Sequence, residues 1–566
     1  MHWLLCVLLF LCSFLDAKDN LQITYTPTGK IDTICNEHGD FFRHFEYDAQ
    51  DRLIAGSTLG TRFERSYSPE GYLLEERWNN GLYVQREYDE AGHLIALLLP
   101  HGERIDYTYL GGVLHAISYG SHTHYLGPYD AEGRLLGEEL PDSLGTVQRR
   151  YNPLGCEVEL ITPYLTQTCT YNAQRYLLSA LTENEAHQFT YDSVGQLTSD
   201  EYAFDELHRL LQADVSADGQ VLAIDDLVCD YDEQGRLISK KSPAGSISFH
   251  YDAMLELIRV DTDKYHFTYV YDALGRRIAK IKSSKAPKGL VMSREDFLYD
   301  DLWEIASYDR KGNQQALRVF MLNNPLKPIM LSQAGHLFYP IVDQKGSTLC
   351  LVDLQGKAHF PDTLSPFGRT SEPLLHPWAY HGQRFDPETH LYYFGKRYYD
   401  PALLTWTTPD PVGTFDSPNL YQFLHNNPFY YTDLDGQSSA VIQGLFGLIA
   451  EAAGCAAQAA LDLVVTGLTV NKVTEKVEEP AVEAPPYDGK ELGEDPTKCP
   501  GEGFVWHGRG PPSSGKGSWV NDQTQEKLHP DLNHPGPMKP HWDYESPKYP
   551  KGKEIRLNTD GTWEYK

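Results

Sequence analysis

Tyrosine and leucine positions recur along the first part of the chain in short segments that polar, turn-forming segments separate. A tyrosine followed by an aspartate or another polar residue marks each period of 20 to 22 residues, and a single gap of 40 is interpreted as two periods. Two strands of about seven residues with two tight turns fill about 20 residues, so each period predicts one antiparallel β-hairpin. The anchors are Tyr47, Tyr67, Tyr88, Tyr109, Tyr129, Tyr151, Tyr171, Tyr191, Tyr231, Tyr251 and Tyr271.

The best-formed copies read YDxxGxx and begin at Tyr88, Tyr129, Tyr231 and Tyr271. Aspartate at the first turn position accepts backbone N–H bonds, and the glycine three residues later supplies a positive φ. One such copy alone is an ordinary surface turn, but eleven anchors in phase predict a long β-meander. An open meander exposes an edge and an apolar face, so we expect it to coil into a closed or spiralling shell.

After Asp343 the repeat gives way to a dense block of aromatic, glycine and aspartate motifs. Its marks are GQRFD at 382–386, LYYFGKRYYDP at 391–401, DPVG at 410–413, and a segment from Asn419 through NNP at 426–428 to DLDG at 433–436. The repeats, from about Ile23 to Tyr308, resemble the YD repeat of RHS and teneurin-like proteins, and the block resembles the RHS-associated core. The resemblance implies a mainly β protein, with a YD-repeat hairpin shell over 18–340 that the core, 341–437, plugs at one end.

In the resembled family the core often cleaves the chain just after its final motif through paired aspartates. The matching residues here are Asp410 and Asp433, which place the scissile bond at Gln437-Ser438. Two neighbouring carboxylates do not both ionise readily, so one keeps a proton while the other activates water. The alternative is that both aspartates only form turns.

Two details qualify that assignment. Leu434 and Gln437 stand where the family motif has proline and leucine. Arg384 and Arg397 could orient the carboxylates or stack on aromatic rings, and we assign neither a catalytic role.

The segments outside the shell and core have distinct compositions. An apolar run from Trp3 to Leu15 predicts a signal peptide over 1–17, or alternatively an uncleaved anchor, and hence a secreted or cell-envelope protein. Residues 438–470 are apolar and read as helix, but Glu451 argues against a stable membrane span. Residues 471–498 are rich in proline and glutamate, which is typical of a linker.

Composition supports a β-rich chain and shows an uneven charge. The 37 Tyr and 46 Gly against 6 Met fit many strands and turns. The formal net charge is −30, yet the segment from Lys490 to Lys566 holds 11 basic and 12 acidic residues, so nearly all of the negative charge lies upstream. Such an acidic body repels nucleic acid and anionic membranes and keeps a large shell soluble, whereas the near-neutral tail must be considered separately.

The tail, 499–566, is predicted to be a small separate domain of α+β or β-rich fold. It is rich in tryptophan and histidine, and it resembles the polymorphic toxin type 37 domain, which implies a toxin, generally expected to be a nuclease. For RNA hydrolysis, one histidine would take a proton from a 2′-hydroxyl and another would protonate the leaving oxygen. The candidates are His529, His534 and His541, with Asp531 or Asp543 orienting an imidazole and Arg509 or Lys516 binding phosphate.

This version needs no metal and no cofactor, and we predict none. A second version, ranked below it, uses His529, His534, His541 and Asp543 as metal ligands, although their spacing is not specific for zinc. The alternative for each histidine is a plain turn residue.

The order shell, core, tail favours an RHS-type polymorphic toxin whose shell encloses and delivers the tail into a target cell. Its expected partners are target-cell RNA or DNA, a cognate immunity protein and a component of a secretion apparatus. The rival hypothesis is a cell-surface binding or adhesion protein without enzymatic activity.

Overall fold

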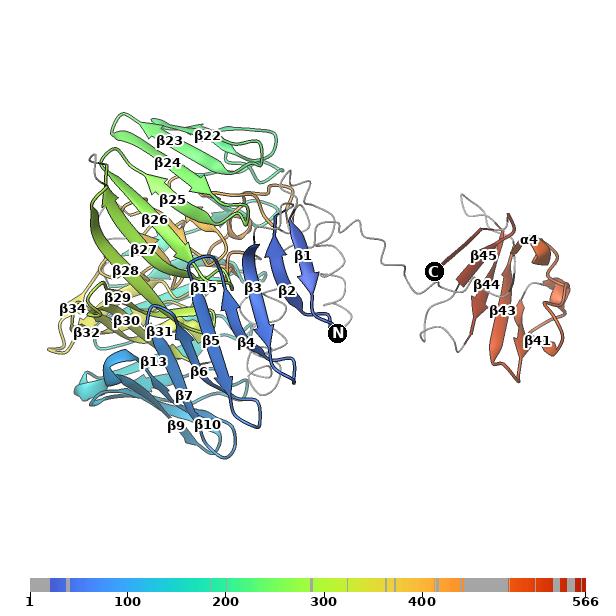
Figure 1. Cartoon of the computed structure of the whole chain (residues 1–566), viewed down its shortest axis with the longest axis horizontal. Helices are drawn as coiled ribbons and strands as arrows, with labels where there is room; N and C mark the ends of the chain where they lie inside the picture. The colour runs from blue at the N-terminus through green and yellow to red at the C-terminus, as the bar shows by residue number, and fades with distance from the viewer. Residues whose placement is uncertain are drawn as a thin grey trace. The chain divides into compact units, whose positions relative to one another are not determined.

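The computed structural model describes residues 21–565 with gaps. The gaps are 37–40, 184, 200, 286–288, 323, 362–363, 371–372, 412, 414–416, 438–439, 442–486, 488, 515, 533–539, 547–554 and 561. The described residues belong to two compact units, Met1–Val473 and Thr474–Lys566 (Figure 1). The predicted signal peptide, Ser438, His534 and all but two residues of the predicted apolar segment 438–470 lie outside the described residues.

The first unit opens with a 17-stranded antiparallel sheet in which successive strands pair in chain order. Two 3-10 turns, η1 (Pro100–Gly102) and η2 (Pro141–Ser143), join neighbouring strands. The strands are β1 (Gln22–Tyr25), β2 (Ile31–Cys35), β3 (Phe41–Tyr47), β4 (Leu53–Ser57), β5 (Arg62–Tyr67), β6 (Leu73–Trp78), β7 (Tyr83–Tyr88), β8 (Leu94–Leu98), β9 (Arg104–Leu110), β10 (Val113–Tyr119), β11 (His122–Leu126), β12 (Gly137–Glu139), β13 (Thr146–Tyr151), β14 (Glu157–Ile161), β15 (Thr166–Tyr171), β16 (Leu177–Leu181) and β17 (Ala186–Gln188).

A short pair, β18 (Thr190–Tyr191) and β19 (Leu197–Thr198), separates this sheet from a second antiparallel meander of 15 strands. Both the pair and the change of sheet fall inside the 40-residue gap of the repeat. The second sheet contains β20 (Asp214–Val215), β21 (Val221–Ile224), β22 (Leu227–Tyr231), β23 (Leu237–Ser242), β24 (Gly245–Tyr251), β25 (Leu257–Asp261), β26 (Tyr265–Tyr271), β27 (Arg277–Ser284), β28 (Val291–Asp300), β29 (Trp303–Asp309), β30 (Gln314–Met321), β31 (Asn324–Gln333), β32 (His336–Val342), β33 (Thr348–Asp353) and β34 (Ala358–His359).

The repeat turns have the predicted chemistry. In the unit that begins at Tyr88, Asp89 Oδ1 accepts the amides of Ala91 at 2.9 Å and His93 at 2.8 Å. Gly92 has a φ of 85°, which a residue with a side chain rarely adopts. The same pair of amide bonds recurs at Asp130, Asp232 and Asp272. The prediction of one hairpin per period is confirmed.

The repeat tyrosines link each hairpin to the one before it. The hydroxyl of Tyr88 donates to the carbonyl of Leu73 at 3.0 Å, and that of Tyr109 donates to Leu94 at 3.1 Å. Equivalent bonds run from Tyr47, Tyr67, Tyr129, Tyr151, Tyr171, Tyr191, Tyr231 and Tyr271 to carbonyls 10 to 16 residues earlier. The regular spacing of the anchors along the chain therefore reflects a hydrogen bond between neighbouring repeats, in addition to the turn within each repeat.

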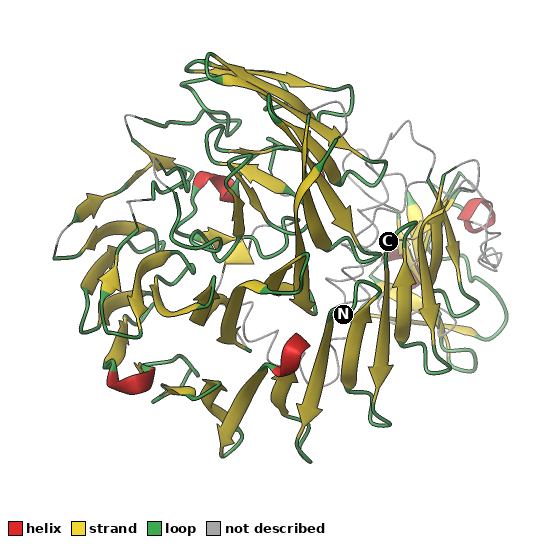
Figure 2. Ribbon diagram, turned by 60° about the vertical axis from the view of Figure 1, so that its left-hand side comes forward, coloured by secondary structure: helices red, strands yellow, loops and turns green. Residues whose placement is uncertain are grey.

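The core block packs against the second sheet. Its elements are β35 (Arg384–Asp386), β36 (Leu391–Tyr393), β37 (Tyr398–Asp400), β38 (Thr405–Trp406), the 3-10 turn η4 (Leu424–Asn426), β39 (Tyr431–Thr432) and β40 (Ala440–Val441). Tyr392, Tyr399 and Phe423 share one buried cluster with residues of β21 to β26. Arg277, at the end of a repeat turn, pairs with Asp386 of the GQRFD motif, so ion pairing also joins shell and core. Strands dominate the described structure, as predicted (Figure 2).

The tail unit is an antiparallel meander of six strands. They are β41 (Phe504–Gly508), β42 (Gly517–Asn521), β43 (Glu526–Asp531), β44 (His541–Glu545), β45 (Ile555–Asn558) and β46 (Trp563–Tyr565), accompanied by the short helix α4 (Gly489–Leu492) and the 3-10 turn η5 (Pro512–Ser514). Leu492 is buried in the tail core and Tyr487 packs against it, so this core draws on residues ahead of Cys499. Among the described residues of the whole chain, no helix is both long and apolar enough to cross a membrane.

Candidate functional site

The tail sheet separates apolar from polar side chains. Side chains alternate between the two faces of a strand. Leu528, Trp542 and Tyr544 belong to the tail core, and the residues between them, including His541 and Asp543, therefore point to the opposite face. That second face carries the histidines and aspartates that the sequence singled out.

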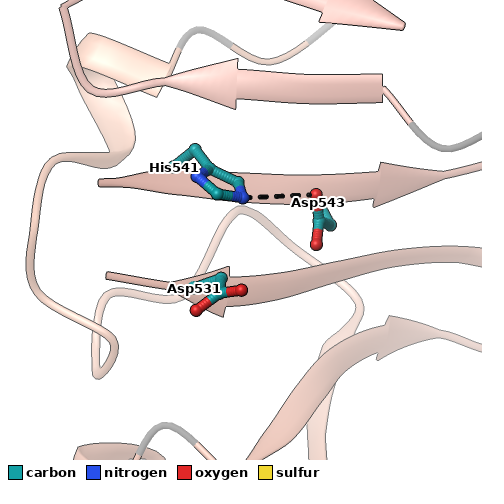
Figure 3. Close-up of side chains that lie close together, drawn as sticks. All are labelled: Asp531, His541 and Asp543. Atoms are coloured by element: carbon teal, nitrogen blue, oxygen red, sulfur yellow. Dashed lines mark ion pairs between the residues drawn. The ribbon is translucent and has the colours of Figure 1, made fainter. Parts of the chain in front are cut away.

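Three of these residues form one cluster. Asp531 stands directly opposite His541 in the pairing of β43 with β44, and Asp543 follows two residues along β44 (Figure 3). One nitrogen or oxygen atom from each side chain lies within 4.8 Å of the other two. His541 is 1% exposed and Asp543 is 7% exposed, whereas Asp531 is half-buried. An imidazole and two carboxylates are thus gathered at a mostly buried place on the sheet.

The imidazole and Asp543 are close without being hydrogen-bonded to each other. His541 Nε2 lies 3.6 Å from Asp543 Oδ1, which exceeds the length of a hydrogen bond (Figure 3). This cluster can orient an imidazole for proton transfer, or it can hold a metal ion between its ligand atoms.

His529 lies beside the cluster on β43. It faces Asp543 in the register of β43 and β44, and its Nδ1 lies 2.7 Å from the carbonyl oxygen of Gly517. A protonated Nδ1 donating to that carbonyl leaves Nε2 as the nitrogen that accepts a proton. His529 therefore has a ring nitrogen position suited to a general base, and His529 and His541, both candidates from the sequence, lie on the same face of the sheet.

The two predicted phosphate ligands lie at the end of the β41–β42 hairpin. The amide of Arg509 donates to the carbonyl of Lys516 at 3.2 Å, and both side chains are exposed. Gly517, which follows Lys516, is the residue whose carbonyl contacts His529. The basic pair is therefore at the same end of the sheet as His529. The third predicted histidine, His534, lies outside the described residues.

The core block brings together the second predicted pair, Asp410 and Asp433, through one arginine. Arg397 Nη1 lies 2.8 Å from Asp410 Oδ2, and Arg397 Nη2 lies 3.6 Å from Asp433 Oδ2. The Arg397 guanidinium also lies 4.2 Å from the centre of the Trp406 ring. We assigned no role to Arg397 from the sequence, yet it is the residue that holds the two carboxylates near each other.

The two aspartates have different surroundings. Asp433 is 1% exposed, and burial, followed by the charge of Asp435, raises its pKa well above the ordinary value. Asp410 forms an ion pair with the Arg397 guanidinium. Asp433 is therefore the carboxyl of the pair that is suited to carry a proton.

The segment that ends at the predicted scissile bond is held by the same residues. Asp433 Oδ1 accepts the amide of Gly436 at 2.8 Å, and Arg397 Nε donates to the carbonyl of Gly436. Asp435 Oδ1 accepts the amide of Gln437 at 3.1 Å. Gln437 is therefore anchored next to the carboxylates, while Ser438, the other side of that bond, lies outside the described residues. The sequence reasoning missed Asp435, whose position inside the DLDG motif was its only signal.

Comparison with known proteins supports the predicted resemblance. The family described as Teneurin YD-shell matches residues 157–429, which span the end of the first sheet, the second sheet and most of the core. The resemblance of the chain to RHS/YD-repeat, teneurin-like proteins is confirmed over these residues. The YD shell and the core are the parts that this match includes, and the tail is beyond its last residue.

Similar curated proteins include toxins that carry different activities. The YD-repeat chain is 24% identical over 479 residues to "Double-stranded DNA deaminase toxin A" of Burkholderia cenocepacia, covering 72% of this chain and 33% of that protein. It is 24% identical over 262 residues to "tRNA3(Ser)-specific nuclease WapA" of Bacillus spizizenii, covering 44% of this chain and 11% of that protein. The chain therefore spans a third or less of the length of these two relatives.

Solved structures show the same shell fold. The structure described as TcdB2-TccC3-TEV superposes with a TM-score of 0.55 at 17% identity. The aligned residues cover 74% of this YD-repeat chain and 26% of the chain in that solved structure. At this identity the likeness concerns the fold alone.

Proposed function

We propose that this protein is an exported RHS-type toxin, in which the YD shell carries the C-terminal tail as cargo and the tail cleaves nucleic acid in a target cell. The observation that carries the proposal is the cluster of Asp531, His541 and Asp543 beside His529 on the polar face of a separately folded tail. The names of similar proteins, among them a DNA deaminase toxin and a tRNA nuclease, support a nucleic-acid target.

For RNA, the tail residues supply a metal-free route. His529 Nε2 would accept the proton of a 2′-hydroxyl, whose oxygen attacks phosphorus. The bond from phosphorus to the 5′-oxygen then breaks, and His541 would give that oxygen a proton. Arg509 and Lys516 would bind the negative charge that builds on the phosphoryl oxygens. Asp543, 3.6 Å from His541, would orient the imidazole.

Expression of residues 474–566 in a bacterial cytoplasm tests the proposal. The wild-type tail is expected to stop growth and degrade cellular RNA, and H529A and H541A are expected to abolish both effects, because each removes a proton-transfer group. H507A is the matched control, since His507 is an exposed histidine on β41 and lies outside the cluster.

A folded wild-type tail that leaves growth and nucleic acid unaffected would contradict the enzymatic proposal. Surface retention of an uncut, harmless full-length chain would then favour the adhesion hypothesis. A toxic tail also implies a cognate immunity protein in the producing cell, and a component of a secretion apparatus is a further expected partner.

We also propose that the core cleaves the chain between Gln437 and Ser438. Asp410 would take a proton from water, whose oxygen attacks the Gln437 carbonyl carbon, and Asp433 would donate its proton as the peptide bond breaks. The geometry of Arg397, which contacts both carboxylates and the Gly436 carbonyl, supports this assignment.

Intact-mass measurement of the purified full-length chain tests self-cleavage. Wild-type protein is expected to give two fragments that meet at Gln437, whereas D410N is expected to remain one chain of 64.1 kDa before any leader removal. D142N is the matched control, because Asp142 lies in η2, the turn between β12 and β13 of the first sheet, outside the core block. An uncut wild-type chain would refute the proposal.

A further inference from the structure

We infer that Asp531, His541 and Asp543 form a binding site for one divalent transition-metal ion of the Mn²⁺ or Zn²⁺ class. This inference deepens the proposed function of the tail and rests on it for any role in catalysis. With the ion bound, His541 is a ligand, and His529 replaces it as the donor of the proton to the leaving oxygen. Binding of the ion itself is a separate property that can be measured without a substrate.

The spacing of the ligand atoms supports the site. Two atoms that bind one ion at about 2.1 Å each, at tetrahedral or octahedral angles, lie about 3.0 to 3.4 Å apart. His541 Nε2 and Asp543 Oδ1 are 3.6 Å apart, a separation close to that range and longer than a hydrogen bond. Asp531 completes a set in which all three atoms lie within 4.8 Å of one another. Movements of about 1 Å, shared among the side chains, would bring all three atoms onto one ion.

The strand register makes this set rigid. Asp531 and His541 are opposite each other on β43 and β44, where Cβ atoms of paired residues lie about 5 Å apart. Asp543 is on the same strand and the same face as His541. Three ligands from two hydrogen-bonded strands need no loop closure to meet, so the backbone positions them before any ion arrives.

Charge gives an independent argument. Two carboxylates are close together at a place where His541 is 1% exposed and Asp543 is 7% exposed, and buried carboxylates are balanced by a cation, either a side chain or a metal ion. A divalent ion supplies that charge at short range. Arg556 faces Asp543 in the pairing of β44 with β45 and is the competing source of positive charge, so the experiment must separate the two.

The donor types indicate which ions fit. A neutral imidazole suits zinc and other transition ions, whereas magnesium and calcium favour oxygen ligands alone. Three protein ligands leave at least one position for water, which is the pattern of catalytic rather than structural metal sites.

An ion here would widen the substrate class of the tail. His529 Nε2 would take a proton from a water held by the ion, and the oxygen of that water would attack phosphorus directly, so the bond from phosphorus to the leaving oxygen breaks without a 2′-hydroxyl nucleophile. The leaving oxygen would take a proton from protonated His529. The tail would then cleave DNA as well as RNA in the presence of Mn²⁺.

Titration of metal-free, full-length protein with Mn²⁺, followed by electron paramagnetic resonance and repeated with Zn²⁺ by calorimetry, tests the site. We expect one tight ion per chain, and a loss of affinity of about tenfold or more in the isosteric variants D531N and D543N, because each removes a charged ligand. D522N, at an exposed aspartate of the tail, is the matched control. R556Q should keep the ion if the metal, not the arginine, neutralises the cluster.

Absence of a tight ion in the wild-type chain, or equal affinity in wild type, D531N and D543N, would overturn the inference. An ion that binds to a tail that cleaves nothing would leave the site standing and refute the proposed function. RNA cleavage that persists in EDTA, together with absent ion binding, would refute the metal site and leave the proposed function intact. Circular dichroism of each variant verifies that the sheet is folded.

Discussion

Asp435 adds a third carboxyl group to the pair that we predicted in the core. Its Oδ1 accepts the Gln437 amide, and its charge, after burial, is the next cause of the raised pKa of Asp433. Burial also raises the pKa of Asp435 itself. This residue therefore sets the protonation of Asp433, the proposed proton donor, and is a positioning residue for the predicted scissile segment.

A pH dependence of self-cleavage follows. Asp433 donates a proton only while it is protonated, and its raised pKa keeps it protonated well above the usual range of an aspartate. Cleavage is expected to fall as the pH rises through the pKa of Asp433. D435N removes a neighbouring negative charge and should lower that pKa, so that the alkaline limb moves to lower pH.

The measurement is the rate of fragment formation across a pH series for chains made by cell-free synthesis. D435E keeps the charge and serves as the control, with an alkaline limb close to that of wild type. An identical limb in wild type and D435N would show that Asp435 has no part in this titration.

The candidate residues could be predicted only where the chemistry is local in sequence. Asp531, His541 and Asp543 stand out as a run of charged and imidazole side chains, and two paired strands bring them together. The contact between Arg397 and both aspartates depends instead on how the aromatic core folds. No pattern near residue 397 distinguishes an arginine that stacks on a ring from one that pairs with Asp410, and Arg397 does both.

At the scale of the hairpin, the hydroxyls of ten of the eleven repeat tyrosines donate to a backbone carbonyl of the preceding repeat, a bond that phenylalanine could not make. Tyr271 is the most enclosed example that we consider, because its hydroxyl donates to the Leu257 carbonyl at 2.9 Å and also contacts the Tyr398 hydroxyl. Removing a buried donor leaves its acceptors unsatisfied, which costs about 1 to 3 kcal/mol.

Y271F should therefore lower the free energy of unfolding of the shell by about 1 to 3 kcal/mol. Urea unfolding followed by tryptophan fluorescence measures the change. Y125F is the control, since Tyr125 is 44% exposed and is not an anchor of the repeat. Equal stabilities of Y271F and Y125F would show that the hydroxyl bond contributes nothing to the hairpin array.

The hairpins themselves were predictable because a turn is encoded within seven residues. The aspartate, the glycine and the tyrosine act on neighbouring backbone groups, and the structure reproduces each of these roles. The break between the two sheets was not predictable, since the interval from Tyr191 to Tyr231 has the length of two ordinary periods. That interval contains several turns, among them those at Asp205 and Ser216, and most of the small pair β18–β19.

At the scale of the whole first unit, buried ion pairs join the two large sheets. Arg276 Nη2 lies 2.8 Å from Glu76 Oε1, and Arg86 Nε donates to Asp300 at 3.0 Å. Glu76 and Arg86 belong to the first sheet, while Asp300 belongs to β28 and Arg276 directly precedes β27. Breaking a buried pair by removing one partner is strongly destabilising, because the remaining charge loses its compensation.

Acid should therefore weaken the joined sheets. Despite the cost of burial, the charges of Arg276 and Arg65 lower the pKa of Glu76 from 4.5 to about 2. The corresponding stability, about 3 kcal/mol, is present above pH 4.5 and is lost as the pH falls toward 2.

Denaturant unfolding of the full chain at a series of pH values tests this. E76Q should be less stable than wild type at neutral pH and should lose less stability on acidification, because it has no proton to bind at this site. E64Q, at an exposed glutamate of the first sheet, should follow wild type. If the free energies of unfolding of wild type and E76Q changed in parallel with pH, the assignment of this acid sensitivity to Glu76 would be contradicted.

The tyrosine hydrogen bond to the preceding repeat gives the shell a direction of assembly. Most hairpins receive a tyrosine bond from the hairpin that follows, so during synthesis the newest of them lacks this bond until about twenty more residues have been added. The sheet therefore forms from its N-terminal end, and a chain that stops early would lack this bond only in its last hairpin. Deletion of one whole repeat period should remove one hairpin from the shell and let the flanking hairpins pair with each other. Deletion of half a period would leave a tyrosine hydroxyl without the backbone carbonyl to which it donates.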